Sequence, residues 1–184
     1  MARITYSNLM SLDGYIADRD GNFDWAEPVG EVHEAVNDDA RSAGTMALGR
    51  RVYDVLRAWD DIDPEGEPGP MTEFAAIWHA SDKLVYSRSL TSLEAPRTTL
   101  AREFDPEALR AFADAADRDV SIGGAELAAQ AFAAGVVDDV VTWVFPVTVG
   151  GGTPAFPPDA RVGLELVAER RLAGGVVELR YTAR

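Results

Sequence analysis

The 184-residue chain lacks cysteine altogether and contains only two histidines, His33 and His79. Without cysteine, the protein has no disulfide, no thiolate nucleophile and no cysteine-ligated metal site. Two histidines are also too few for a histidine-rich metal centre. We therefore predict that the protein binds no metal.

Long apolar runs are missing as well. No segment approaches the roughly 20 apolar residues that a membrane-spanning helix requires. The N-terminal stretch MARITYSNLMSLDGYIAD lacks the order of basic, apolar and small-residue regions that marks a signal peptide. With 47% apolar and 26% charged residues the composition is that of a globular protein, and we expect one cytoplasmic domain over residues 1–184.

Positive charge is scarce: 17 basic residues face 31 acidic ones, which gives a formal net charge of −14. Such a protein repels nucleic acid and anionic membranes, because binding a polyanion depends on many lysine and arginine contacts. An anionic small molecule remains a possible ligand where basic side chains are grouped locally. The positions of the few arginines are therefore informative.

Strand-like and helix-like patterns alternate along the chain. Strands are expected at residues 2–9, 45–49, 83–87, 98–102, 119–122 and 136–147, and a closing hairpin at 162–170 and 175–183. Helical faces are expected at about 30–43, 50–59, 71–78, 109–116 and 127–132. This order predicts a single α/β domain with a mostly parallel sheet and an antiparallel C-terminal edge.

Three junctions that follow predicted strands carry anion-binding chemistry. They are LGRR at 48–51, YSRS at 86–89 and IGGA at 122–125. Arginine forks, hydroxyl groups and the free N–H groups of a helix start all suit phosphate. In an open α/β sheet, ligands bind beyond the carboxyl ends of the strands, so the three junctions can converge on one ligand.

Each junction also has a simpler interpretation. A Gly-Gly pair after a strand is more often a turn, adjacent arginines are often a solvated helix start, and Ser-Arg-Ser is often a polar loop. The sequence has no G-x-x-x-x-G-K-[ST] motif, and no G-x-G-x-x-G follows the first strand, so a P-loop is excluded and a classical Rossmann site is disfavoured. The joint occurrence of three such junctions in an acidic chain favours the phosphate interpretation.

LGRRVYD, YSRSL and VSIGGAELAAQAF, in this order, resemble the dihydrofolate reductase fold. The resemblance is closer to the reductase domain of the bifunctional riboflavin-biosynthesis deaminase/reductase and its stand-alone relatives. NLMSLDGYIAD is similar to the N-terminal motif of that group, and VVDDVVTWVFPVTVGGGTPAF to its C-terminal strand and loop. The motifs span nearly the whole chain. The implied fold is a mixed, mostly parallel sheet with helices on both faces.

The same resemblance implies NADPH as cofactor. It assigns Gly49, Arg50 and Arg51 to the phosphates, and Ser87 and Arg88 to the adenosine 2′-phosphate. The residues assigned to the pyrophosphate are Gly123, Gly124, Ala125, Glu126 and Leu127. An arginine near the ribose 2′-position, as Arg88 would be, distinguishes NADP sites from NAD sites, in which an acidic residue holds the 2′-hydroxyl. The resemblance also implies a non-proline cis peptide between Gly123 and Gly124.

Substrate contacts are implied for Asp13, Gly14 and Tyr15, of which Asp13 offers hydrogen-bond acceptors to an amino-pyrimidine. An Asp-Gly turn is the alternative. Tyr15, Phe23 and Trp25 suit stacking on a flat ring, or they anchor the loop.

Three further positions complete the candidate substrate site. Counting back from LGRR places His33 where dihydrofolate reductases keep an acidic residue; the alternative is an exposed helix start. Trp143 either walls the pocket or packs in the core. Thr153 follows three glycines that form either a mobile cover or a plain surface loop.

We therefore predict a single-domain NADPH-dependent reductase of a small pyrimidine- or pterin-like substrate, with no assignable catalytic residue. The chain lacks the zinc motif of a deaminase, so it would act as a reductase only. The alternative is a non-catalytic NADP(H)-binding sensor or interaction module. The resemblance also suggests a homodimer to which the strand at 136–147 contributes.

Overall fold

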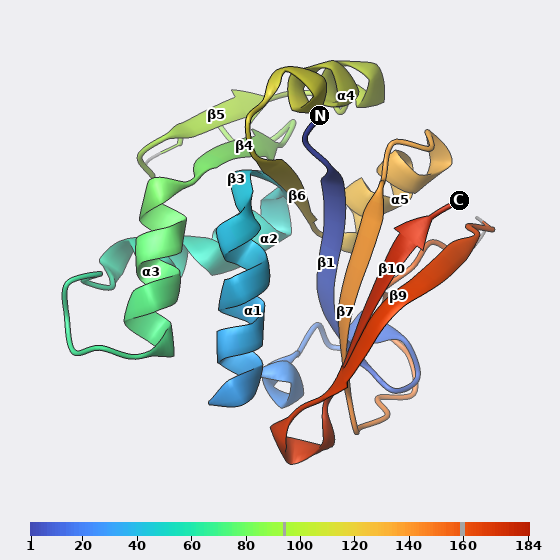
Figure 1. Ribbon diagram of the computed structural model, residues 1–184. Coiled ribbons are helices and arrows are strands. Elements are labelled where there is room, and N and C mark those ends of the chain that lie inside the picture. Colours follow the sequence, from blue (N-terminus) through green and yellow to red (C-terminus); the bar gives the residue numbers. More distant parts are fainter. Residues whose placement is uncertain (94, 159–160) are drawn as a thin grey trace.

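The structure is a computed structural model that describes residues 1–93, 95–158 and 161–184. An eight-stranded sheet has the order β5-β4-β3-β6-β1-β7-β10-β9, and a two-stranded ribbon joins β2 to β8 (Figure 1). The strands are β1 Ile4–Ser11, β2 Tyr15–Ala17, β3 Ala43–Gly49, β4 Asp82–Tyr86, β5 Thr98–Ala101, β6 Asp119–Gly123, β7 Asp139–Phe145, β8 Thr153–Pro154, β9 Leu164–Arg171 and β10 Val177–Ala183. The helices are α1 Glu31–Ser42, α2 Arg50–Leu56, α3 Pro70–Ala80, α4 Pro106–Ala115 and α5 Ala125–Ala133, with 3-10 turns η1 Asp24–Ala26, η2 Arg57–Asp61 and η3 Ala173–Gly175.

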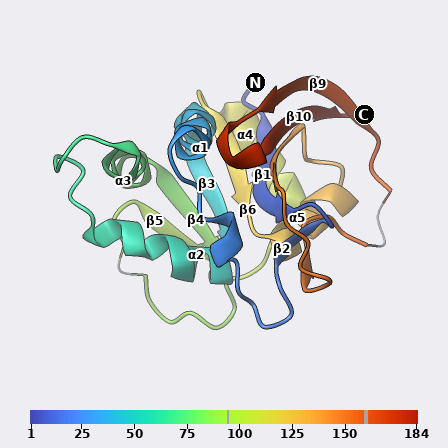
Figure 2. The same cartoon turned by 90° about the horizontal axis from the view of Figure 1, so that it is seen from below.

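The six strands from β5 to β7 in the sheet order are parallel, and β10 and β9 close the sheet antiparallel. The predicted fold class is therefore confirmed. Because all six parallel strands point the same way, their carboxyl ends share one edge of the twisted sheet; β1 runs downward toward that edge in Figure 1, and Figure 2 shows the molecule from below.

Helices cover both faces of the sheet (Figure 1). On one face α4 and α5 pack over Ile4 and Val140. On the other face α1 packs over Trp143, and Trp78 of α3 packs with Val85. The alternation of apolar residues along each strand supplies both cores, since neighbouring side chains point to opposite faces. No helix within the described ranges is both long and apolar enough to cross a membrane.

The long strand predicted at 136–147 is shorter, spanning Asp139–Phe145, and it has no free edge to offer to a second copy of the chain. Strand β7 lies inside the sheet between β1 and β10, and both of its edges are hydrogen-bonded. Its side chains are buried on both faces, as Val140 and Trp143 illustrate. The exposed outer strand is β9, with Leu166 and Val167 at 50% and 66% exposure.

The two glycines between β6 and α5 have different structural reasons. Gly124 begins α5 with φ 108° and ψ 130°, a conformation that residues with a Cβ rarely adopt. Gly123 lies where a Cβ would sit 2.7 Å from a methyl carbon of Leu48. The peptide between them is trans, so the predicted cis bond is wrong. The positive φ of Gly124 makes the turn from strand to helix instead.

We expect Gly124→Ala to lower the free energy of unfolding by about 1–3 kcal/mol, because it forces a side chain into this backbone conformation. Gly69→Ala is the matched control. Gly69 also begins a helix, but it has φ 174°, and a Cβ there would meet no atom within 4 Å. The loss in Gly69→Ala should stay below about 1 kcal/mol in urea unfolding. Equal losses for the two variants would contradict this account of Gly124.

Candidate functional site

The predicted junctions lie side by side on the carboxyl edge of the sheet, in the order of their strands. Ser87 follows β4, Gly49 ends β3, Gly123 ends β6 and Ser11 ends β1. Neighbouring strands are about 4.8 Å apart, so the path from β4 to β1 covers roughly 14 Å. Such a path can accommodate an elongated ligand that lies across the strand ends.

The start of α2 contacts the loop after β4. The Arg50 guanidinium donates to the hydroxyl of Ser89 over 2.7 Å, and its Nε donates to Asp54 over 3.3 Å. Sequence reasoning did not assign Ser89, although it belongs to the YSRS motif. The LGRR and YSRS junctions therefore form one surface.

Within that loop, Ser87 is a structural residue and Arg88 is the outward-facing one. The buried Ser87 hydroxyl accepts from the backbone N–H groups of Ser89 and Leu90 at 3.3 and 3.1 Å. Arg102 donates to the carbonyls of Ser87 and Leu90 and holds the loop in place. Arg88 is exposed, and no described residue forms an ion pair with it. Arg102 was missed because its side chain reaches back to a loop twelve or more residues away, which no local pattern indicates.

The glycine junction meets the start of α2 on its other side. A Cβ on Gly124 would lie 3.9 Å from the Cα of Gly49. Arg51 and Glu126 form an ion pair of 3.0 Å across the two helix starts, with side chains more than 80% exposed. Such an exposed pair contributes at most about 1 kcal/mol, so Arg51 remains free to exchange Glu126 for another anion.

The remaining two residues of that motif differ in orientation. Ala125 is partly buried at the first position of α5. Leu127 is 4% exposed and packs in the core under α5. Because the side chain of Leu127 is buried in the core, only its backbone can contact a ligand at the start of α5.

At the end of β1, Asp13 ties two loops together. Its carboxylate accepts from the Ser11 hydroxyl at 2.6 Å, from the Val149 N–H at 3.1 Å and from the Gly150 N–H at 2.7 Å. The hydrogen bond from Ser11, with those from the two amides, lowers the pKa of Asp13. These three bonds use three of the roughly four acceptor sites of the carboxylate, so about one remains for a substrate.

The β2–β8 ribbon brings the predicted substrate residues of the two loops into one place. Tyr15 lies opposite Pro154, and Thr153 lies opposite Ala17. Next to the ribbon, Gly14 accepts a backbone hydrogen bond from Ala155 at 2.9 Å. The stretch before Thr153 is therefore anchored at both of its ends.

His33 and Trp143 lie apart from this ribbon. His33 is a buried side chain of α1 that packs edge-on against Trp59 at 6.0 Å and near Phe74 at 6.4 Å. Trp143 is 1% exposed in the core between the sheet and α1. Both side chains have a packing role that explains their placement.

Burial lowers the pKa of His33, against the weaker opposite influence of Glu73. The unfolded chain, with a histidine pKa near 6.5, therefore takes up a proton more readily than the folded one. We expect stability that is fully present above about pH 6.5 and declines as the pH falls toward the lower folded value. As the pH falls from 7.5 to 5.5, the free energy of unfolding of His33→Phe, measured with urea, should therefore rise relative to that of the wild type. Parallel pH profiles for the two proteins would contradict the lowered pKa of His33.

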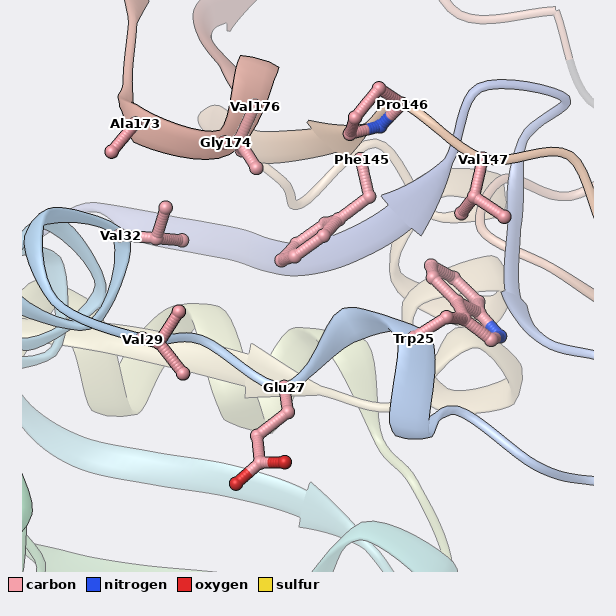
Figure 3. A pocket seen from close by; sticks show the side chains of 10 residues that line it. All are labelled: Trp25, Glu27, Val29, Val32, Phe145, Pro146, Val147, Ala173, Gly174 and Val176. Carbon is pink, nitrogen blue, oxygen red and sulfur yellow. The ribbon is translucent and has the colours of Figure 1, made fainter.

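An apolar cavity of about 310 Å³ lies beyond β1 at the end of β7 (Figure 3). Its walls come from η1 and the segment before α1, from the end of β7 and from the η3 turn. Trp25 and Phe145 face the space with ring centroids 6.2 Å apart and planes at 76°. Among the described residues, no group of three or more His, Asp or Glu side chains is arranged to hold a metal.

The chain is similar to several known proteins over nearly its whole length. The Bacillus subtilis (strain 168) protein YyaP is 26% identical over 182 residues, covering 97% of this chain and 94% of YyaP. A Shewanella sp. PV-4 protein named for riboflavin biosynthesis superposes with a TM-score of 0.76 at 19% identity, covering 100% and 99% of the two chains.

Two enzymes share the fold at lower identity. A Thermotoga maritima bifunctional deaminase and phosphoribosylaminouracil reductase gives a TM-score of 0.67 at 14% identity, over 100% of this chain and 57% of the enzyme. Enterococcus faecalis dihydrofolate reductase in complex with NADP(H) gives 0.62 at 15% identity, over 99% and 96%. Residues 2–177 match the RibD C-terminal domain, and the chain thus belongs to this reductase-domain family, as the sequence motifs predicted.

Proposed function

We propose that the protein is an NADPH-dependent reductase whose cofactor extends along the carboxyl edge of the sheet from β4 to β1. The observation that carries the proposal is the contact of the three junctions. Arg50 reaches Ser89, Arg51 reaches Glu126, and Gly49 lies beside Gly124. A chain with a net charge of −14 has thus grouped exposed arginines at neighbouring strand ends.

The donor set fits a dinucleotide phosphate. Arg88 offers an exposed guanidinium fork to a 2′-phosphate, and Arg50 and Arg51 supply two more at the start of α2. The first N–H groups of α5 have no partner within the helix, and the absence of a Cβ at Gly124 leaves them accessible to a pyrophosphate. The NADP(H) complex of the Enterococcus faecalis relative supports the same cofactor.

When bound, NADPH would supply a hydride to a carbon–nitrogen or carbon–oxygen double bond, and a proton from water would complete the two-electron reduction. The chain positions and shields the reactants. The loop around Asp13 and the ribbon at Thr153 border the β1 end of the path. The resemblance to the riboflavin-pathway reductases implies that Tyr15 and Asp13 line the substrate side.

The proposal is tested by following NADPH absorbance with a panel of pterins, pyrimidines and quinones, after an NADPH titration monitored by tryptophan fluorescence. We expect saturable NADPH binding and NADPH consumption with at least one heterocycle. Binding without consumption of NADPH would favour the non-catalytic module. No binding of NADPH would contradict the cofactor assignment.

A further inference from the structure

We propose that the substrate is an uncharged or cationic ring compound without a phosphate group, bound in the apolar cavity at the end of β7. This inference rests on the proposed function, because it takes the cavity as the substrate side of the NADPH path. It separates this protein from the Thermotoga maritima relative, whose name specifies a phosphoribosyl compound.

The cavity lies one strand beyond the end of the NADPH path. Phe145, in its wall, is paired with Ser11 in the ladder between β7 and β1. The N–H of Leu12 donates to the carbonyl of Val147, another wall residue, over 2.7 Å. Adjacent strands are about 4.8 Å apart, so a compound in the cavity neighbours whatever occupies the end of β1.

The lining suits a flat apolar ring. Figure 3 shows the rings of Trp25 and Phe145 on one side of the space and the methyl groups of Val29 and Val32 on the other. Aromatic faces and branched aliphatic walls favour planar apolar ligands. A volume of about 310 Å³ is small for a ligand site, which favours a compact compound.

The charges around the cavity are negative. Glu27 is the one charged side chain among the described residues that line it, and Figure 3 shows its carboxylate at the rim, turned away from the apolar walls. A second carboxylate, Glu31, accepts from the N–H of the wall residue Ala173 over 2.8 Å.

The arginines that are close in sequence to the residues lining the cavity are directed elsewhere. Arg170 on β9 forms an ion pair of 2.6 Å with Glu178 on β10. Arg171 follows it on β9 and therefore points to the opposite face of the sheet. Arg19 donates to the carbonyl of Gly150 at 2.8 Å. None of the three arginines lines the cavity.

A phosphate in this position would lose part of its hydration against the apolar lining and would gain no cation from it. Partial desolvation of an unpaired anion is unfavourable, and the carboxylate of Glu27 adds repulsion. An uncharged ring avoids both costs, and a cationic ring is attracted to Glu27. Three exposed arginines, Arg50, Arg51 and Arg88, lie at the proposed phosphate path, and no arginine is among the described residues that line the cavity.

The test uses two fluorescent probes with the same aromatic frame. N-phenylnaphthylamine is neutral, and anilinonaphthalenesulfonate carries one additional sulfonate. We expect the neutral probe to bind the full-length protein at least about tenfold more tightly than the sulfonate, because the cavity offers no partner for an anion. Leu166→Ser, which removes an exposed apolar side chain on β9, is the control and should leave this ratio unchanged.

Two variants locate the probe and identify the origin of its selectivity. Glu27→Gln should narrow the affinity ratio about two- to fivefold, since it removes the rim charge. Val29→Arg places a cation at the wall and should reverse the preference toward the sulfonate. Val29 is 68% exposed, so this substitution is compatible with folding.

Equal or tighter binding of the sulfonate by the wild-type protein would overturn the proposal. The proposal would also be overturned if Val29→Arg left the affinity ratio of the two probes unchanged, or if NADPH competed with the neutral probe. A protein that binds no NADPH would contradict the proposed function, and the probe ratio would still decide the charge preference of the cavity.

Discussion

Replacing Arg88 with alanine is expected to weaken NADPH binding by about ten- to one-hundredfold, because a hydrogen-bonded charged partner contributes about 1.5–3 kcal/mol. NADH binding should change by less than about twofold, since NADH has no 2′-phosphate for the guanidinium to contact. Titration of both nucleotides against tryptophan fluorescence measures the two affinities.

Arg88 is suited to this test because its removal leaves the loop intact. The loop is held by the Ser87 hydroxyl and by Arg102, and neither depends on the Arg88 side chain. Arg184→Ala is the matched control, since Arg184 is also exposed but lies on the opposite edge of the sheet, paired with Glu165. Equal losses of NADPH and NADH affinity in Arg88→Ala would show that Arg88 does not contact the 2′-phosphate.

Gly152→Ala is expected to be the most destabilising alanine substitution in the loop before β8. Gly152 has φ 135°, and a Cβ there would overlap the carbonyl oxygen of Ala17 and the carbonyl group of Asp18. Both groups are backbone atoms of the facing segment and have no rotamer by which to move away. We expect a loss of about 2–4 kcal/mol in the free energy of unfolding from strain and overpacking together.

Gly150→Ala separates the clash from the backbone conformation. Gly150 has φ 72°, but a Cβ there would meet no atom within 4 Å. The loss in Gly150→Ala should therefore be limited to about 1–2 kcal/mol. Thermal unfolding of the two variants measures the difference. A Gly152→Ala variant no less stable than Gly150→Ala would contradict the close packing of the β2–β8 ribbon.

The sheet and its helices were predictable because their signals are local. Alternating apolar residues in 119–122 and the helical face of 127–132 each identify an element within a few residues. The three phosphate-like junctions were also predictable, since parallel strands must end at a common edge. The position of LGRR beside YSRS and IGGA follows from the sheet order alone.

The β2–β8 ribbon could not be predicted from such patterns. Its strands have three and two residues, and they pair across more than 130 positions of the chain. The ribbon exists because Asp13 binds the loop at Gly150 and the Tyr6 hydroxyl donates to the Ala155 carbonyl at 2.7 Å. These are tertiary hydrogen bonds, which no local periodicity reports.

The position of His33 illustrates the same limit for the site. Counting back from LGRR gave its place in the chain, but the direction of its side chain depends on how α1 meets Trp59 and Phe74. Helical periodicity indicates which residues share a face, and only the packing of neighbouring helices decides which face a ligand can reach.

A crystal structure of the protein with NADPH tests the central claim most directly. We predict density for the nucleotide along the carboxyl edge of the sheet, with the 2′-phosphate on Arg88, the pyrophosphate at Gly124 and the nicotinamide beside the end of β1. A nucleotide bound elsewhere, or one that crosses the edge without contact to Arg88 and Gly124, would contradict the account.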